Sequence, residues 1–138
     1  MKVSPGFYRH VLPAVLYVLG IFVGGSWPQG IDTGLDFTYQ DKVLHLVVFG
    51  GLVVLVERAL SALLPTRRPS TRLWFALATA CVVGGLLELW QALLPSRQAE
   101  LGDWLADAVG ALLAAFVVWR IGGEGWPTEP AQAPASKR

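Results

Sequence analysis

Residues 43–64 read VLHLVVFGGLVVLVERALSALL, and this stretch decides the fold. His45 is the only polar side chain in it before Glu57 and Arg58, which lie close to its end. A helix rises about 1.5 Å per residue, so a run of this length can cross the hydrocarbon core of a bilayer, about 30 Å thick. The stretch therefore predicts a membrane-spanning helix.

Three further runs have the same character, at residues 11–27, 73–94 and 104–121. The chain has 138 residues, of which 54% are hydrophobic and 15% charged, and its mean hydropathy is +0.50. A bundle in water would need polar faces on its helices, and these runs have almost none before their ends. We predict an all-α integral membrane four-helix bundle over residues 11–121, preceded by a cytoplasmic segment, 1–10, and followed by a disordered cytoplasmic tail, 122–138.

The first run has two interpretations. Lys2 and Arg9 precede it, as in a signal peptide, but no clear small-x-small cleavage site follows. Gly20 and Gly24 instead have the G-x-x-x-G spacing that lets membrane helices approach closely, which favours a retained helix. The small residues that we expect at helix contacts are Gly20, Gly24, Gly84, Gly85, Gly110 and Ala114.

Basic residues predict the orientation, because Lys and Arg in short loops mark the cytoplasmic side. Most of them fall on one side: Lys2, Arg9, Arg58, Arg67, Arg68, Arg72, Arg120, Lys137 and Arg138. Only Lys42 and Arg97 fall on the other. Both termini are therefore expected in the cytoplasm. We expect Arg67, Arg68 and Arg72 to contact anionic lipid head groups.

A second set of polar residues lies in the outer half of the predicted helices: Asp41, Lys42, His45, Glu88, Gln91, Arg97, Asp103 and Asp107. Ionisable groups at such depths usually face the protein interior. On a helical wheel, Glu88 shares a face with the small or polar residues Ala78, Cys81, Gly84, Gly85, Gln91 and Ala92. The opposite, lipid-directed face carries Val82, Val83, Leu86, Trp90, Leu93 and Leu94.

The next helix repeats this pattern, since Asp103, Asp107, Gly110 and Ala114 are aligned. Asp41 and Lys42 lie one turn before His45, and this polar stripe continues in the run 43–64 through Phe49, Leu52 and Val56. We expect Glu88 to face inward and to need a partner, with Lys42, His45 and Arg97 as the candidates.

Several function classes are not indicated. The net charge of +1 and the scattered basic residues give no nucleic-acid-binding pattern. Cys81, the only cysteine, has no partner for a disulfide and no zinc-ligand spacing. No H-E-x-x-H motif is present, and Asp32-Thr33-Gly34 is interpreted as a turn. We expect no metal and no cofactor.

The order and spacing of Asp41-Lys42-x-x-His45, Glu88-x-x-Gln91, Pro95, Arg97, Asp103 and Gly110 resemble the VanZ-like family of bacterial membrane proteins. The likeness covers about residues 8 to 120, with one departure: the family usually has asparagine where this chain has Asp107. The resemblance implies a multi-pass protein of the bacterial inner membrane and a link to resistance to the glycopeptide teicoplanin.

Three functions fit the pattern. The first is a non-enzymatic protein whose outward-facing polar pocket binds a cell-wall precursor or a lipid-linked ligand, with Lys42 and Arg97 holding phosphate or carboxylate. The second is an intramembrane enzyme, because a histidine among carboxylates suits acid–base chemistry or a divalent metal. The third is a polar network that only fixes helix packing. The expected partners are the lipid bilayer and such a ligand, without nucleic acid; the oligomeric state is left open.

Overall fold

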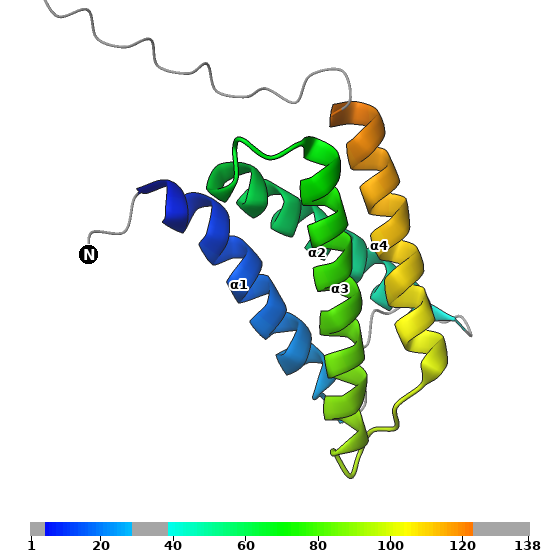
Figure 1. The fold of residues 1–138 in the computed structure, drawn as a ribbon. Coiled ribbons are helices and arrows are strands. Elements are labelled where there is room, and N and C mark those ends of the chain that lie inside the picture. The colour runs from blue at the N-terminus through cyan, green and yellow to red at the C-terminus, as the bar shows by residue number, and fades with distance from the viewer. Residues whose placement is uncertain (1–4, 29–38, 123–138) are drawn as a thin grey trace, which may run out of the picture.

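The computed structural model describes residues 5–28 and 39–122, and this part of the chain forms four helices without a strand. The helices are α1 (Pro5–Gly25), α2 (Gln40–Leu63), α3 (Pro69–Ala92) and α4 (Leu101–Gly122), as Figure 1 shows. The prediction of an all-helical fold with four long helices is confirmed. The expected turn at Asp32 and residues 123–138 of the predicted tail lie outside the described residues, whereas Gly122, predicted to begin the tail, is the last residue of α4.

Each helix begins several residues before the apolar run that predicted it. α2 and α4 include polar first turns, which contain Asp41 and Asp103. A carboxylate in this position interacts favourably with the helix dipole. α3 begins with Pro69, where a missing N–H costs no helical hydrogen bond. The predicted starts were late because backbone hydrogen bonds continue into polar residues that hydropathy does not mark.

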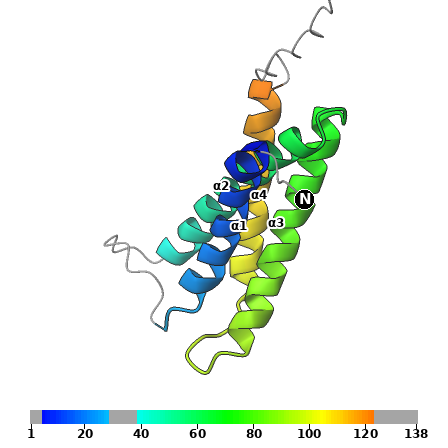
Figure 2. The same ribbon diagram turned by 90° about the vertical axis from the view of Figure 1, so that its left-hand side faces the viewer.

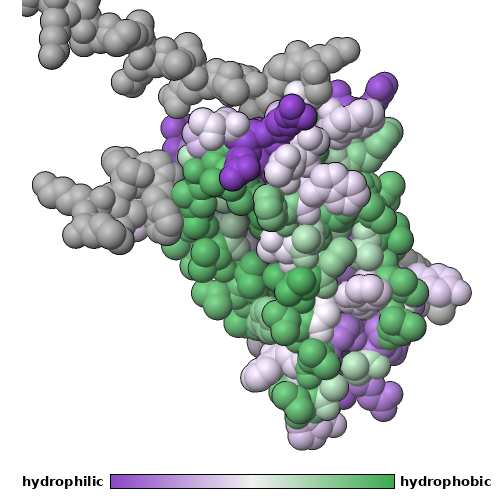
Figure 3. Space-filling view, in the orientation of Figure 1, coloured by the Kyte–Doolittle hydropathy of each residue, from purple (hydrophilic) through white to green (hydrophobic). Residues whose placement is uncertain are grey.

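All four helices are long and apolar enough to cross a bilayer. Within the apolar segment of each helix, only 11% to 33% of the residues are buried inside the protein. Large apolar side chains such as Val23, Leu89 and Phe116 are therefore exposed. Figure 3 shows this hydrophobic surface across the middle of the molecule, with hydrophilic groups toward the ends. Such a surface is stable against lipid rather than water, which identifies a multi-pass membrane protein.

α2 and α3 each pack against the three other helices, and the contact between α2 and α4 is the most extensive. Figures 1 and 2 show α1 and α4 at opposite sides of the bundle, and within the described residues these two helices make no contact. The buried core joins α2 to all of its neighbours and consists of Ile21, Phe49, Leu52, Val53, Ala76, Ala80, Val83, Leu87 and Ala111. The predicted inward stripe of α2 is thus confirmed at Phe49 and Leu52.

Glycines set the closest helix contacts. A Cβ at Gly110 would collide with the backbone of Leu46, and one at Gly50 would lie 3.3 Å from the carbonyl oxygen of Gly110. α2 and α4 therefore cross almost backbone to backbone. Gly51 faces α1 instead, where a Cβ would lie 2.6 Å from the hydroxyl of Tyr17. Gly50 thus allows α4 to approach α2 closely, and Gly51 does the same for α1.

The predicted packing glycines are confirmed on α3 and α4 but not at Gly20. A Cβ at Gly84 would lie 2.7 Å from Oδ2 of Asp107, and one at Gly85 would be in ordinary contact with Trp104. Ala114 packs against Gly50. Gly20, in contrast, has open space around it, and the α1 residue that meets α3 is Gly25, against Leu87 and Gln91. The prediction for Gly20 was wrong because α1 meets α3 five residues further along the helix, at Gly25.

The buried face of α3 differs from the predicted face at three residues. Ala78 and Ala92 are exposed although we expected them inside, and Val83 is buried although we expected it to face lipid. α3 packs against α1, α2 and α4, so its buried face is broad and accepts large residues such as Leu87. Small size alone was therefore a poor marker of the interior. The predicted exposure of Val82, Leu86, Trp90 and Leu93 is confirmed.

A buried ion pair closes the end of the bundle at the α2–α3 connection. Nε of Arg72 lies 3.3 Å from Oε1 of Glu57, and Nη1 of Arg72 donates to the carbonyl of Arg67 at 2.6 Å. Ser61 also donates to Oε1 of Glu57, at 2.8 Å. Both members of the pair are buried. Arg72 is thus paired with Glu57, and the prediction that it contacts lipid head groups was wrong.

Candidate functional site

The predicted polar residues gather at the opposite end of the bundle. α2 and α4 begin there and α3 ends there (Figure 1), so their first and last turns meet. α2 supplies Asp41, Lys42 and His45, while α4 supplies Asp103 and Asp107. Glu88 comes from α3, and Arg97 from the connection that follows. We call these seven residues the polar niche.

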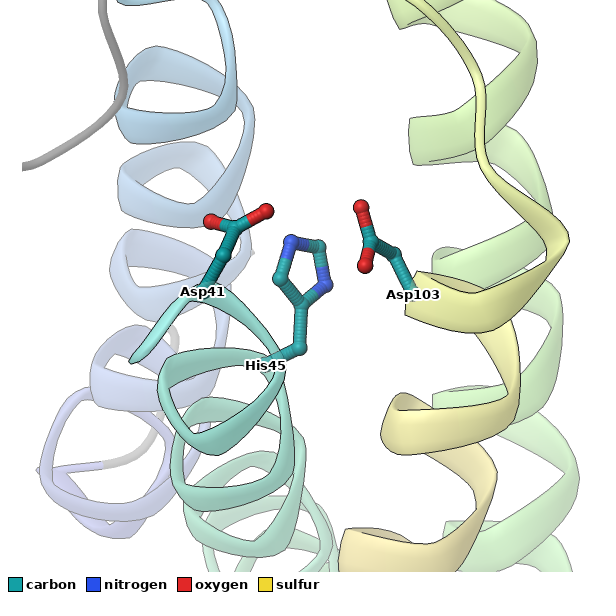
Figure 4. Close-up of side chains that lie close together, drawn as sticks. All are labelled: Asp41, His45 and Asp103. Carbon is teal, nitrogen blue, oxygen red and sulfur yellow. The ribbon is translucent and has the colours of Figure 1, made fainter. Parts of the chain in front are cut away.

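His45 and Asp107 form the most deeply buried pair of the niche. Nδ1 of His45 lies 2.8 Å from Oδ1 of Asp107, and the two residues are 8% and 1% exposed. The imidazole also stacks parallel to the ring of Phe49, one turn further along α2. Figure 4 shows it between the carboxylates of Asp41 and Asp103. The ring is therefore fixed in orientation and surrounded by acidic groups.

Lys42 bridges the rim of the niche. Its Nζ donates to Oδ1 of Asp103 at 2.8 Å and to Oε2 of Glu100 at 3.3 Å. Asp103 is buried, whereas Lys42 and Glu100 are accessible. The sequence interpretation missed Glu100, although its place directly before α4 was a usable signal. Lys42 is thus already paired with two carboxylates.

Glu88 has a different partner from those we expected. Its Oε2 accepts the backbone N–H of Glu100 at 2.8 Å, while Oε1 is buried without a hydrogen-bond partner among the described residues. Of the three candidate partners, His45 lies close to it, since one donor atom each from His45, Glu88 and Asp107 falls within 4.8 Å of the others. Lys42 is paired elsewhere. The prediction that Glu88 faces the interior is confirmed by its 9% exposure.

Gln91 lies beside the niche and ties α3 to α1. It is fully buried, and its Nε2 donates to the carbonyl oxygen of Gly25 at 3.1 Å. Trp90 reinforces this contact, because its Nε1 donates to the hydroxyl of Ser26 at 2.8 Å. The structure thus gives Gln91 a contact between helices, on the α1 side of α3.

A cavity of about 460 Å³ opens between α1 and α2 and reaches the niche. We call it the α1–α2 cavity. Asp41, His45 and Arg97 line its polar end, and Nε of Arg97 is buried without a hydrogen-bond partner among the described residues. The remaining walls are almost entirely apolar or glycine: Pro13, Leu16, Tyr17, Gly20, Ile21, Gly24, Gly25, Leu44, Val48, Phe49 and Leu87.

The open space beside Gly20 therefore belongs to this cavity rather than to a helix contact, and Gly24 also lines the cavity. Its lining on α1 runs from Pro13 to Gly25, which corresponds to about 18 Å of helix. An elongated apolar space with charged groups at one end can hold a molecule that is itself apolar and charged at one end.

Comparisons with protein-family models, with curated proteins and with solved structures found no match.

Proposed function

We propose that the protein binds a membrane amphiphile, with the polar head of the ligand in the niche and its hydrocarbon chain in the α1–α2 cavity. One observation carries the proposal: the cavity is apolar along its length and bears Asp41, His45 and Arg97 at one end. Ligand sites of this kind combine mostly apolar walls with a few polar groups that fix orientation.

The apolar part suits a single hydrocarbon chain. The lining of α1 from Pro13 to Gly25 spans about 18 Å, close to the roughly 15 Å thickness of one leaflet of the hydrocarbon core. Gly20 and Gly24 leave room for the chain beside α1, since neither has a side chain to fill the space. A chain lying here would replace contacts between these walls and bulk lipid.

The polar end suits an anionic head group that also carries hydrogen-bond donors. The guanidinium of Arg97 has a free, buried Nε, and arginine binds phosphate or carboxylate through parallel hydrogen bonds. Asp41 is exposed at the same end and accepts hydrogen bonds from hydroxyl or amino groups. A phosphate attached to a sugar or another hydroxyl-rich group has both features.

The distribution of basic residues supports an external position for the niche. The α2–α3 connection and the final turn of α4 lie at the end remote from the niche (Figure 1), and they carry Arg67, Arg68 and Arg120. By the positive-inside rule this end is cytoplasmic. The niche then opens at the outer leaflet, where lipid-linked precursors of the cell envelope are used.

Binding can be tested on the full chain in phosphatidylcholine nanodiscs, with farnesyl phosphate as the probe. Gly20→Leu should fill the cavity without disturbing the fold, because nothing lies within 4 Å of a Cβ there. Val23→Leu is the matched control, since it adds bulk to α1 on an exposed face. We expect Gly20→Leu and Arg97→Gln each to weaken binding at least tenfold, and Val23→Leu to leave it unchanged. Equal affinity in all four proteins, or no binding by the wild type, would contradict the proposal.

The resemblance to the VanZ-like family gives a cellular test. We infer an envelope role in a bacterial inner membrane, in which expression of the chain lowers susceptibility to teicoplanin. Glu88→Ala and Arg97→Ala should remove this effect at unchanged membrane abundance, because they alter the niche from α3 and from the connection to α4. Wild-type resistance in both variants would count against a role for the niche.

A further inference from the structure

The geometry points to a binding site for one divalent transition-metal ion between His45, Glu88 and Asp107. Each residue comes from a different helix, and one donor atom from each lies within 4.8 Å of the others. All three residues are buried, at 8%, 9% and 1% exposure. This inference does not rest on amphiphile binding, because two of the three donors, Glu88 and Asp107, do not line the cavity, although His45 does.

The charges of the niche favour a cation at this position. Within the described part of the chain no Lys or Arg lies within 4 Å of the carboxylate of Glu88 or Asp107. Lys42 is paired with Asp103, and Arg72 with Glu57 at the far end of the bundle. Buried charges without a counter-charge are costly at membrane depth. One dication balances the two carboxylates while His45 stays neutral.

Two orphaned oxygen atoms give independent support. Oε1 of Glu88 and Oδ2 of Asp107 are both buried and have no hydrogen-bond partner in the described structure. Buried polar atoms almost always have a partner, so two such atoms on neighbouring carboxylates need an explanation. A metal ion held by these groups supplies it, because a carboxylate can bind a metal through one or both of its oxygens.

The existing contacts are close to those of a metal centre. Ligands that share a zinc ion lie about 3 to 3.5 Å from each other, given metal–ligand distances near 2.0 to 2.2 Å. Nδ1 of His45 and Oδ1 of Asp107 are already 2.8 Å apart. Metal binding at Nδ1 would break this hydrogen bond, and the neutral imidazole would then carry its one proton on Nε2. The donor of Glu88 lies within 4.8 Å of those of His45 and Asp107.

The donor types narrow the choice of ion. Imidazole nitrogen suits Zn²⁺ and Fe²⁺, carboxylate oxygen suits Mn²⁺ as well, and a site with one nitrogen and few oxygens is a poor match for Ca²⁺, which takes six to eight oxygens. A second donor set, Asp41, His45 and Asp103, shares the imidazole. It is the weaker candidate because Asp41 is exposed and Asp103 already binds Lys42.

The test uses the full chain in nanodiscs, stripped with a chelator and titrated with Zn²⁺ or Mn²⁺ alone. Calorimetry and elemental analysis should find one equivalent per chain for at least one of the two ions. Glu88→Gln and Asp107→Asn should raise the Kd at least tenfold. Glu100→Gln is the control: it removes a carboxylate at the rim that lies outside the donor set, and it should bind like the wild type.

Three outcomes would overturn the inference: no stoichiometric binding of either ion by the wild type, unchanged affinity in both donor variants, or affinity lost in Asp41→Asn but kept in Glu88→Gln. Size-exclusion profiles and thermal unfolding show whether each variant folds. Should the donor variants fail to fold, anomalous scattering from a zinc-soaked crystal of the wild type decides, because the peak must lie between the three donors.

Discussion

Gly110 on α4 packs directly against the backbone carbonyl of Leu46 on α2, leaving no room for a Cβ. This contact sets the separation of the two helices that carry most of the polar niche. Asp107 lies one turn before Gly110 and His45 next to Leu46, so the 2.8 Å contact between Nδ1 of His45 and Oδ1 of Asp107 depends on it.

Gly110→Ala should therefore destabilise the protein, although alanine is the better helix former. Overpacking of this kind costs about 1 to 3 kcal/mol, which exceeds the gain of up to about 1 kcal/mol in helix propensity. The matched control is Gly20→Ala, where a Cβ meets open space. Thermal unfolding in detergent should show a lower Tm for the first variant only. Equal Tm values would mean that α2 and α4 do not cross as closely as described.

The pair formed by Glu57 and Arg72 gives a second stability prediction. Arg72→Met leaves the buried carboxylate of Glu57 without its cation, and breaking such a pair costs about 3 to 5 kcal/mol. Replacing both members with apolar residues is often neutral, so Glu57→Leu combined with Arg72→Met should recover most of the lost stability. Unfolding of the single and double variants measures the coupling. A double variant less stable than Arg72→Met would contradict the pairing.

The predictable features of this fold have local causes. The length of each apolar run predicts the four helices, and the period of α4 correctly places Asp103, Asp107 and Gly110 on one inward face. Periodicity also brings His45 into line with Phe49. These features depend only on residues within one helix.

The missed features depend on how helices meet. A wheel shows which residues share a face, but not which neighbour covers it, so it could not tell Gly20 beside a cavity from Gly25 against Leu87. The oxygen Oε2 of Glu88 is bound by a backbone N–H, at Glu100, which no search among side chains would find. Likewise the three donors proposed for a metal ion come from three helices, so they form no sequence motif.

The hydrogen bond from Gln91 to Gly25 gives a prediction about how α1 is held against α3. Gln91→Ala removes the hydrogen bond to the carbonyl of Gly25 and empties a fully buried position. Leaving that carbonyl unpaired costs about 1 to 3 kcal/mol. Because the loss falls on the contact between α1 and α3, amide hydrogen exchange should increase in the last turns of α1 and remain slow in the middle of α4. Gln98→Ala, at an exposed position, is the control. Unchanged exchange in α1 would show that this contact does not hold the helix.

Cysteine labelling tests the proposed orientation. In a Cys81→Ala background, Gln98→Cys and Thr66→Cys each place one thiol at an exposed position, in the α3–α4 and α2–α3 connections respectively. The connections lie at opposite ends of α3, and the arginines next to Thr66 predict a cytoplasmic side. A membrane-impermeant maleimide should label Gln98→Cys in intact cells, and Thr66→Cys only after permeabilisation. The reversed pattern would keep the four spans but place the niche inside the cell, which excludes an external ligand. Labelling of both thiols in intact cells would contradict a membrane-spanning α3.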